Sequence, residues 1–186
     1  EIALKEREER AIRQRMAIAE LAVDNRIAEA NLSEAFAIVV KKSAKALAVA
    51  RVGIWLLSDD KQSLICYAMY DGQTKKFSKC QPLMVSDYPS YFKSIFKENR
   101  IFVNDVLTDE RVKELKDGYL KPKGISSLLD AGVTIEGHLA GVVCFEHVGQ
   151  KRNWEVDEES FAVTIASFVG QTILSSRRKE SEKALA

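Results

Sequence analysis

The residues best suited to chemistry are three cysteines and two histidines, and their spacing argues against most catalytic uses. Cys66, Cys80 and Cys144 are odd in number and widely separated, unlike a disulfide framework, and free thiols suit a reducing compartment. His138 and His147 stand at opposite ends of one expected strand, and no CxxC or HxxxH spacing occurs. We therefore predict no metal site and no catalytic residues.

Cys80 is the thiol whose surroundings best favour reactivity, because it follows Lys79 in a polar segment. Cys66 and Cys144 fall within apolar strands, where a thiol usually behaves as a small hydrophobic side chain. A cysteine-based enzyme remains an alternative, and it requires an exposed Cys80 close to a second thiol.

Polar side chains of the middle region are candidates for contact with a small molecule. We select Tyr91, Asp105 and Asp130, together with Cys144 and Glu146, which share one alternation of the last expected strand. The alternative for each is structural: Tyr91 would be a core residue, Asp105 would cap a turn, and Asp130 would pair with a neighbour.

Composition excludes several classes of protein. With 46% hydrophobic residues in 186, the chain can bury a core and is not intrinsically disordered. Its 28 basic and 27 acidic residues leave a net charge of +1, so it lacks the basic excess of a nucleic-acid binder. No stretch is apolar enough for a membrane span, and the charged N-terminus is not a signal peptide. We expect a cytoplasmic piece of a longer protein.

The first fifty residues predict two helices, since they lack Gly and Pro and are rich in strong helix formers. We place the break at Asn31–Ser33, with Ser33 capping a second helix from Glu34 to about Val49. Apolar residues at 4-3-4 spacing in the first helix predict a coiled-coil seam: Ile12, Met16, Ala19 and Val23. The alternative is a single solvated helix lying on its own domain.

From residue 51 the pattern changes to strands. Arg51–Ser58 and Ser63–Tyr70 are rich in strand formers and predict a β-hairpin. Asp71–Asp87 is a polar stretch, which we expect to be an irregular loop over a pocket. A short helix opening at Pro89 and ending near Asn99, and a strand at Ile101–Val103, follow.

The last third alternates helix, two strands and helix. The Thr108 hydroxyl should cap a helix whose first turn carries Asp109 and Glu110, and that helix should end before Lys121. Strands are expected over Ser126–Thr134 and His138–His147. Asn153 should cap a long final helix, which runs from about Trp154 to beyond Ser176. Strands joined by hairpins imply an antiparallel sheet, hence an α+β fold with helices over the sheet.

The closing motif resembles that of the GAF domain family: Gly137-x3-Gly141-x4-Glu146-His147-x-Gly149-x2-Arg152-x-Trp154-x2-Asp157-Glu158-x2-Phe161-Ala162. Two further stretches, around Asn104-Asp105 and over residues 125–131, support a resemblance that spans about residues 32–175. Within the motif, we expect Glu146 and Arg152 to form an ion pair across a turn, and Trp154 to pack at the sheet end in the first turn of the last helix.

This resemblance implies a sensory domain of a bacterial signalling protein, of the type found before histidine kinase, PAS or diguanylate cyclase modules. It implies an N-terminal signalling helix (1–31), the GAF-like domain (32–175) and the start of a linker helix (176–186). We expect a non-catalytic, homodimeric domain that binds an unidentified small molecule.

The resemblance leaves alternatives open. One is a ligand-free dimerisation or spacer module, whose pocket is filled by its own aromatic side chains. Another is an enzyme similar to free methionine sulfoxide reductase, a GAF protein that works with cysteines. Trp154-x2-Asp157-Glu158 departs from the signature of cyclic-nucleotide-binding GAF domains, so that ligand class has no support, and no cofactor is identified.

Overall fold

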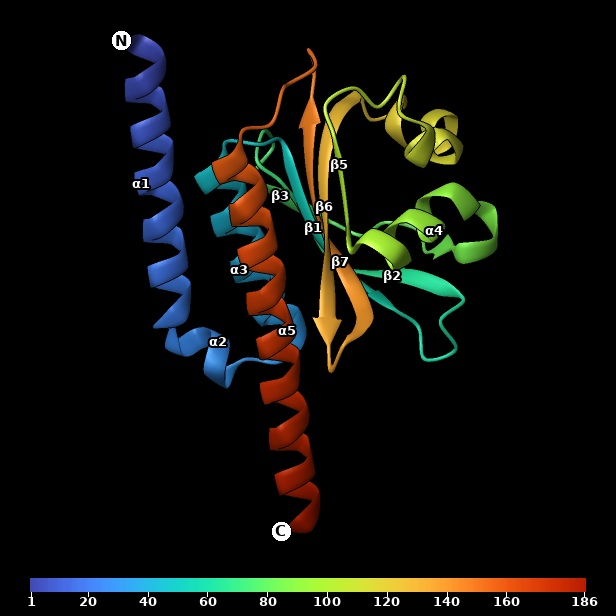
Figure 1. The fold of residues 1–186 in the computed structure, drawn as a ribbon. Coiled ribbons are helices and arrows are strands. Elements are labelled where there is room, and N and C mark those ends of the chain that lie inside the picture. The colour runs from blue at the N-terminus through green and yellow to red at the C-terminus, as the bar shows by residue number, and fades with distance from the viewer.

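The computed structural model describes all 186 residues and has three layers, with an antiparallel sheet between a layer of long helices and a layer of short ones (Figure 1). The strands lie in the order β3-β2-β1-β7-β6-β5, and β4 pairs with β2 beside β3. Their bounds are β1 Arg51–Leu57, β2 Ser63–Asp71, β3 Lys76–Ser78, β4 Leu83–Met84, β5 Arg100–Val103, β6 Ile125–Ile135 and β7 His138–Val148. The predicted α+β class is confirmed.

Two helices, α3 (Leu32–Leu47) and α5 (Val156–Leu185), form the long-helix layer on the sheet, and α1 (Ile2–Ala22) packs on their outer side (Figure 1). The other face of the sheet is covered by α4 (Pro89–Glu98) and by the helical turns η1 (Val85–Asp87), η2 (Glu110–Leu115) and η3 (Lys116–Leu120). Each face buries its own apolar cluster, because alternate strand residues point to opposite sides. No helix has both the length and the apolar character that a membrane crossing requires.

The N-terminal region contains one more helix than expected. A short helix, α2 (Asn25–Glu29), separates α1 from α3, and its N-cap is Asp24. The predicted cap Ser33 lies inside α3; the side chain of Asn31 instead accepts a hydrogen bond from the Glu34 amide. The predicted cap and the predicted number of helices were wrong, because Asp24 and Asn31 each offer a local capping bond within a stretch of uniform helix formers.

Helix α1 rests on the domain through one face and leaves the opposite face free. Gln14, Ala17 and Leu21 are buried against the long-helix layer. Met16, Ala19 and Val23 of the predicted seam each follow one of these buried residues by two positions, which places the seam about 200° around the helix from the buried face. There Ile12 is 48% exposed, Met16 57% and Val23 77%.

Asp71–Asp87 is more ordered than the expected loop. The pairs Met69–Ser78 and Leu64–Leu83 place β3 and β4 on the same edge of β2 and in one register. The segment is therefore an interrupted edge strand, followed by η1, because the backbone of β2 offers hydrogen bonds along its whole length.

Both later helix starts also differ from the prediction. The N-cap of η2 is Asp109, whose carboxylate accepts from the Arg111 amide, and the segment forms a 3-10 and then a π turn rather than an α-helix. Helix α5 starts at Val156, and Glu155 and Glu158 form its capping box. Trp154 stays outside the helix because its amide donates to Asn104 Oδ1 and its indole to the Val103 carbonyl.

Candidate functional site

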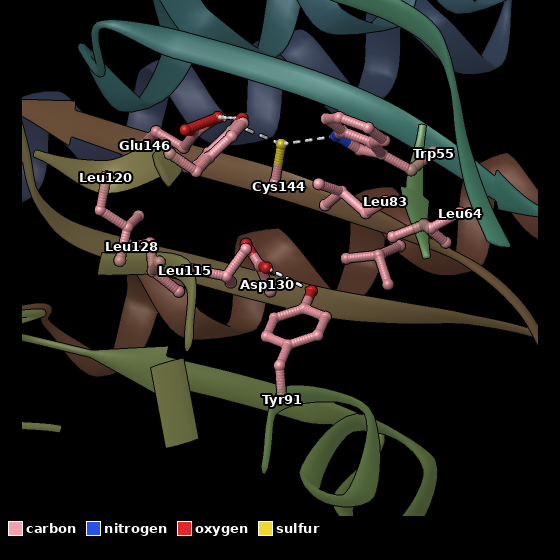
Figure 2. Close-up of a pocket in the computed structure, with 12 residues that line it drawn as sticks. Trp55, Leu64, Leu83, Tyr91, Leu115, Leu120, Leu128, Asp130, Cys144 and Glu146 are labelled. Carbon is pink, nitrogen blue, oxygen red and sulfur yellow. Dashed lines mark hydrogen bonds between the residues drawn. The ribbon is translucent and has the colours of Figure 1, made fainter. Parts of the chain in front are cut away.

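A small pocket lies between the sheet and the short-helix layer (Figure 2). Its lining comes from β1, β2, β4, α4, η2, η3, β6 and β7: Trp55, Leu64, Leu83, Tyr91, Leu115, Tyr119, Leu120, Leu128, Asp130, Val142, Cys144 and Glu146. The free volume is about 30 Å³, which is room for one or two water molecules. The wall is apolar except for a few polar groups, the usual composition of a small-molecule site.

Four of the five predicted site residues meet in this pocket. Tyr91 reaches it from α4, Asp130 from β6, and Cys144 and Glu146 from β7. Asp105 does not line it. The Asp105 carboxylate accepts from the Leu107 amide and lies 3.6 Å from the Lys151 ammonium.

Asp130 and Tyr91 form the first polar pair of the pocket. The Tyr91 hydroxyl donates to Asp130 Oδ2 at 2.5 Å, and both side chains are buried. Burial raises the pKa of Asp130 to about 8, against the opposing effect of the Tyr91 hydrogen bond. The pKa of Tyr91 is also raised, by burial and by the Asp130 charge. At neutral pH the Asp130 carboxyl therefore keeps its proton.

Glu146 is the centre of a second polar group. Tyr119 Oη donates to Glu146 Oε1 at 2.9 Å, the Cys144 thiol approaches the same oxygen at 3.6 Å, and the Trp55 indole donates to Cys144 Sγ at 3.3 Å. Burial raises the pKa of Glu146, and the positive charge of Arg51 opposes that shift. Burial and the Glu146 charge raise the pKa of Cys144, which stays a thiol.

Each carboxyl group has one oxygen without a protein partner. Asp130 Oδ1 and Glu146 Oε2 are buried and accept no hydrogen bond from the chain. A buried acceptor left in this state costs about 1–3 kcal/mol. Both oxygens belong to groups that line the pocket, so a polar molecule that hydrogen-bonds to them would recover this cost.

A second, open cavity of about 540 Å³ adjoins the pocket and shares Leu83 and Tyr119 with it. Arg51, Lys76, Lys79 and Lys123 line it, and Asp71 is the one acid among its lining residues. Arg51 is only 9% exposed and pairs across the sheet with Glu146. Burial opposes its charge, but Glu146 and other neighbours raise the pKa of Arg51 overall.

Sequence reasoning missed Arg51 and Tyr119. A charged residue at the start of the apolar run after Ala50 was a signal for Arg51, since a buried charge needs a partner. Tyr119 carried no signal, because only the tertiary fold brings η3 over β7.

The expected ion pair between Glu146 and Arg152 is absent. Glu146 points into the pocket, whereas the Arg152 guanidinium bonds the Glu158 carboxylate and lies over the Trp154 ring at 4.7 Å. The prediction was wrong because Glu146 faces the pocket on the short-helix side, whereas Arg152 lies on the long-helix side, where it bonds the Leu47 carbonyl of α3 and the Glu158 carboxylate of α5.

Comparisons with known proteins agree with this architecture. The family model for the GAF domain matches residues 31–173. The GAF domain of an Acinetobacter phosphoenolpyruvate-protein phosphotransferase superposes with a TM-score of 0.68 at 17% identity, over 93% of this chain and 98% of that one. A phycocyanobilin-bound GAF domain from a cyanobacterial phytochrome gives 0.73 at 17% identity, over 89% and 96%.

A third similar structure is a domain described as part of a two-component sensor histidine kinase from Sinorhizobium meliloti 1021. Its TM-score is 0.62 at 20% identity, over 83% of this chain and 98% of that chain. No curated protein shows significant similarity to the sequence. At these identities the structural likeness establishes the fold alone.

Proposed function

Because this chain belongs to the GAF domain family, we propose that it is a non-catalytic sensory domain that binds a small molecule in the pocket under η2 and η3. The observation that carries the proposal is the pair of orphaned oxygens, Asp130 Oδ1 and Glu146 Oε2, in one small pocket. A ligand that accepts a hydrogen bond from the protonated Asp130 carboxyl and donates one to Glu146 Oε2 would satisfy both. We place Tyr91, Asp130, Cys144 and Glu146 in this site.

Binding would displace part of the short-helix layer. The pocket as it stands has about 30 Å³ free, so a molecule larger than water must move its cover. Leu115 and Leu120 cover the pocket from η2 and η3, and Leu83 lines one side of it from the edge strand β4. The adjoining cavity, with Tyr119 and Leu83 in its wall, supplies an entry path.

The sheet would carry the change to the long helices. Asp130 faces the pocket, while its neighbours Leu129 and Ala131 point to the opposite cluster, which includes residues of α3 and α5. Val143 and Phe145 likewise flank Cys144 on β7. A shift of either strand therefore changes packing on both faces. Only a ligand that binds one helix arrangement better than another would drive the shift.

A polar route leads from the sheet end to both terminal helices. The Arg152 amide donates to Ser127 Oγ on β6, and the Arg152 guanidinium bonds Glu158 in the first turn of α5. The adjacent Asp157 accepts two bonds of 2.8 Å from Arg10 of α1. These contacts join the pocket strands, α5 and α1 in one network, of the kind that energetic coupling requires.

The output step would involve a second copy of the chain. The free apolar stripe on α1, comprising Ile12, Met16, Ala19 and Val23, would pair with its copy in a homodimer in the cytoplasm. Figure 1 shows α5 extending well past the sheet edge toward the C-terminus, where it would reach a kinase, PAS or diguanylate cyclase module.

The alternative function is a ligand-free dimerisation and spacer module. The small free volume favours it, because Tyr91, Tyr119 and the surrounding leucines occupy most of the space. The two functions differ in one respect: the spacer carries no small molecule under any condition.

Native mass spectrometry of the freshly purified chain, followed by denaturation to release bound molecules, distinguishes the two. The sensor predicts a reproducible added mass on the wild type that is lost or weakened in Asp130→Asn. The matched variant Asp59→Asn, at an exposed turn, should retain it. Protein without added mass, before and after incubation with the small-molecule fraction of a host-cell extract, would support the spacer.

A further inference from the structure

Two of the three cysteines are brought together at the edge of the sheet. The pairs Met69–Ser78 and Leu64–Leu83 bracket four residues on each side, so residues 79–82 run alongside residues 65–68. Cys66 and Cys80 fall one position out of register within this stretch. Neighbouring strands lie about 4.8 Å apart and disulfides span Cα separations of about 4.4–6.8 Å, so a bond between the two cysteines needs only a small shift of residues 79–82, which form no strand of their own.

Their side chains also lie on the same side of the sheet. Cys66 and Cys80 are half-buried, and both pack against the apolar cluster on the pocket face. The thiol of Cys66 is hydrogen-bonded to Cys80. Cys144 belongs to the same cluster but is fully buried and bonded to Trp55 and Glu146.

The surroundings of Cys80 favour its thiolate. Arg51 Nη2 lies 3.9 Å from Cys80 Sγ, and the open cavity that Cys80 lines also contains Lys76, Lys79 and Lys123. The hydrogen bond from Cys66, with the charges of Arg51 and Lys123, lowers the pKa of Cys80 to about 7 against the effect of burial. The same hydrogen bond and burial raise the pKa of Cys66, which stays protonated.

We propose that Cys80 and Cys66 form a peroxide-reactive thiol pair, in which Cys80 is oxidised first and Cys66 closes a disulfide with it. The Cys80 thiolate attacks one peroxide oxygen; the sulfur–oxygen bond forms, the oxygen–oxygen bond breaks, and the departing hydroxide takes a proton to become water. Cys80 is thereby oxidised by two electrons to a sulfenic acid while the peroxide is reduced.

The second step is internal to the pair. The Cys66 sulfur attacks the Cys80 sulfur, the sulfur–sulfur bond forms, and the sulfur–oxygen bond breaks. The proton of Cys66 leaves with the hydroxide as a second water. The disulfide fixes residues 79–82 to β2, and this segment precedes Leu83 of the pocket lining. The pair is defined by its own geometry and holds whether or not the pocket binds a ligand.

The test treats the fully reduced whole chain with hydrogen peroxide, blocks remaining thiols with an alkylating reagent, and maps the products by peptide mass spectrometry. We expect a Cys66–Cys80 disulfide, with Cys144 recovered alkylated after denaturation. The rate should rise with pH through about 7 and then level off, following the Cys80 thiolate. Cys66→Ser should give a Cys80 sulfenic acid, trapped by dimedone, at a rate within about threefold of the wild type.

Two results would overturn the proposal. One is oxidation of Cys80 no faster than that of Cys144, which would show that the cationic surroundings do not activate it. The other is rapid oxidation of Cys80 that ends in sulfinic acid or in a disulfide between two chains, which would show that Cys66 does not resolve it.

Discussion

Asp130 shows how burial sets the chemistry of the pocket. Its carboxyl group lies in an apolar wall, and one of its oxygens depends on the Tyr91 hydroxyl while the other has no protein partner. A charge in such a place is costly, so the group holds its proton to about pH 8. The neutral carboxyl is both donor and acceptor, which suits a polar ligand better than a buried negative charge would.

This protonation makes stability depend on pH. The pKa of Asp130 is raised in the folded chain, so between about pH 4 and 8 the folded state holds a proton that the unfolded state releases. This contribution is fully present below about pH 4 and is lost as pH rises toward 8. Asp130→Asn, which cannot ionise, should lack it.

The comparison between wild type and Asp130→Asn isolates this effect. Urea unfolding at pH 5, 6, 7 and 8 should show wild-type stability falling relative to the variant by up to about 1.4 kcal/mol per pH unit. Parallel curves for the two proteins would show that Asp130 ionises normally in the folded state.

For individual residues, the sequence could predict which side chains of one strand share a face. Cys144 and Glu146 were paired through their shared alternation, and Asp130 and Tyr91 were placed near them. Asp105 shares no pocket with them, because its position depends on a turn that its own side chain forms with Leu107. The proximity of Cys66 to Cys80 depends on an edge register that no local pattern shows.

Among the elements, the contact between β1 and β7 leaves no room for a side chain at Gly141. A Cβ atom at Gly141 would stand 2.2 Å from the Trp55 carbonyl oxygen, so the two strands must separate to admit any side chain. Gly141→Ala should destabilise the fold by about 1–3 kcal/mol, the range for overpacking.

Gly118 supplies the matched control. It has no atom within 4 Å of an added Cβ, and Gly118→Ala should change the free energy of unfolding by less than about 1 kcal/mol. Urea unfolding of both variants checks the pair. Equal losses of unfolding free energy in the two variants would show that crowding between β1 and β7 does not cause the destabilisation.

Few polar side chains connect α1 to α5. Arg10 and Gln14 both donate to Asp157 at 2.8 Å, and the hydrogen bond from Arg10 lowers the pKa of Asp157. Asp157→Asn keeps the size of the side chain but removes its charge. We expect the backbone amides of α1 to exchange hydrogen at least about fivefold faster while those of β6 and β7 stay unchanged. Unaltered exchange in α1 would show that the apolar contacts of Ala17 and Leu21 hold the helix alone.

Secondary-structure elements were predictable where periodicity and turn residues agree, as in the β1–β2 hairpin and in α4, which opens at Pro89. The helix starts were less predictable. Several residues near each start can cap, and tertiary bonds decide among them: Trp154 is held by Asn104 and Val103, so α5 begins after it. Local sequence does not contain these partners.

At the scale of the whole molecule, the free stripe on α1 predicts self-association. Met16 and Ile12 are exposed at heptad spacing, opposite the face that packs on the domain. We expect a dimer by sedimentation equilibrium, with a dissociation constant raised at least about tenfold in Met16→Glu. Leu4→Glu, at an exposed position outside the stripe, is the control and should leave the dimer intact. A monomeric wild type, or equal effects of both variants, would contradict a dimer through this stripe.

The central claim is that a ligand in the pocket changes the packing of the terminal helices. Hydrogen exchange tests this claim most directly. The freshly purified chain is compared with the same chain after unfolding, dialysis and refolding, and again after the released small molecules are returned. We predict faster exchange in residues 110–120 and in α5 of the stripped chain, with both regions restored by the returned fraction. Identical exchange in all three samples would contradict a ligand-dependent relay.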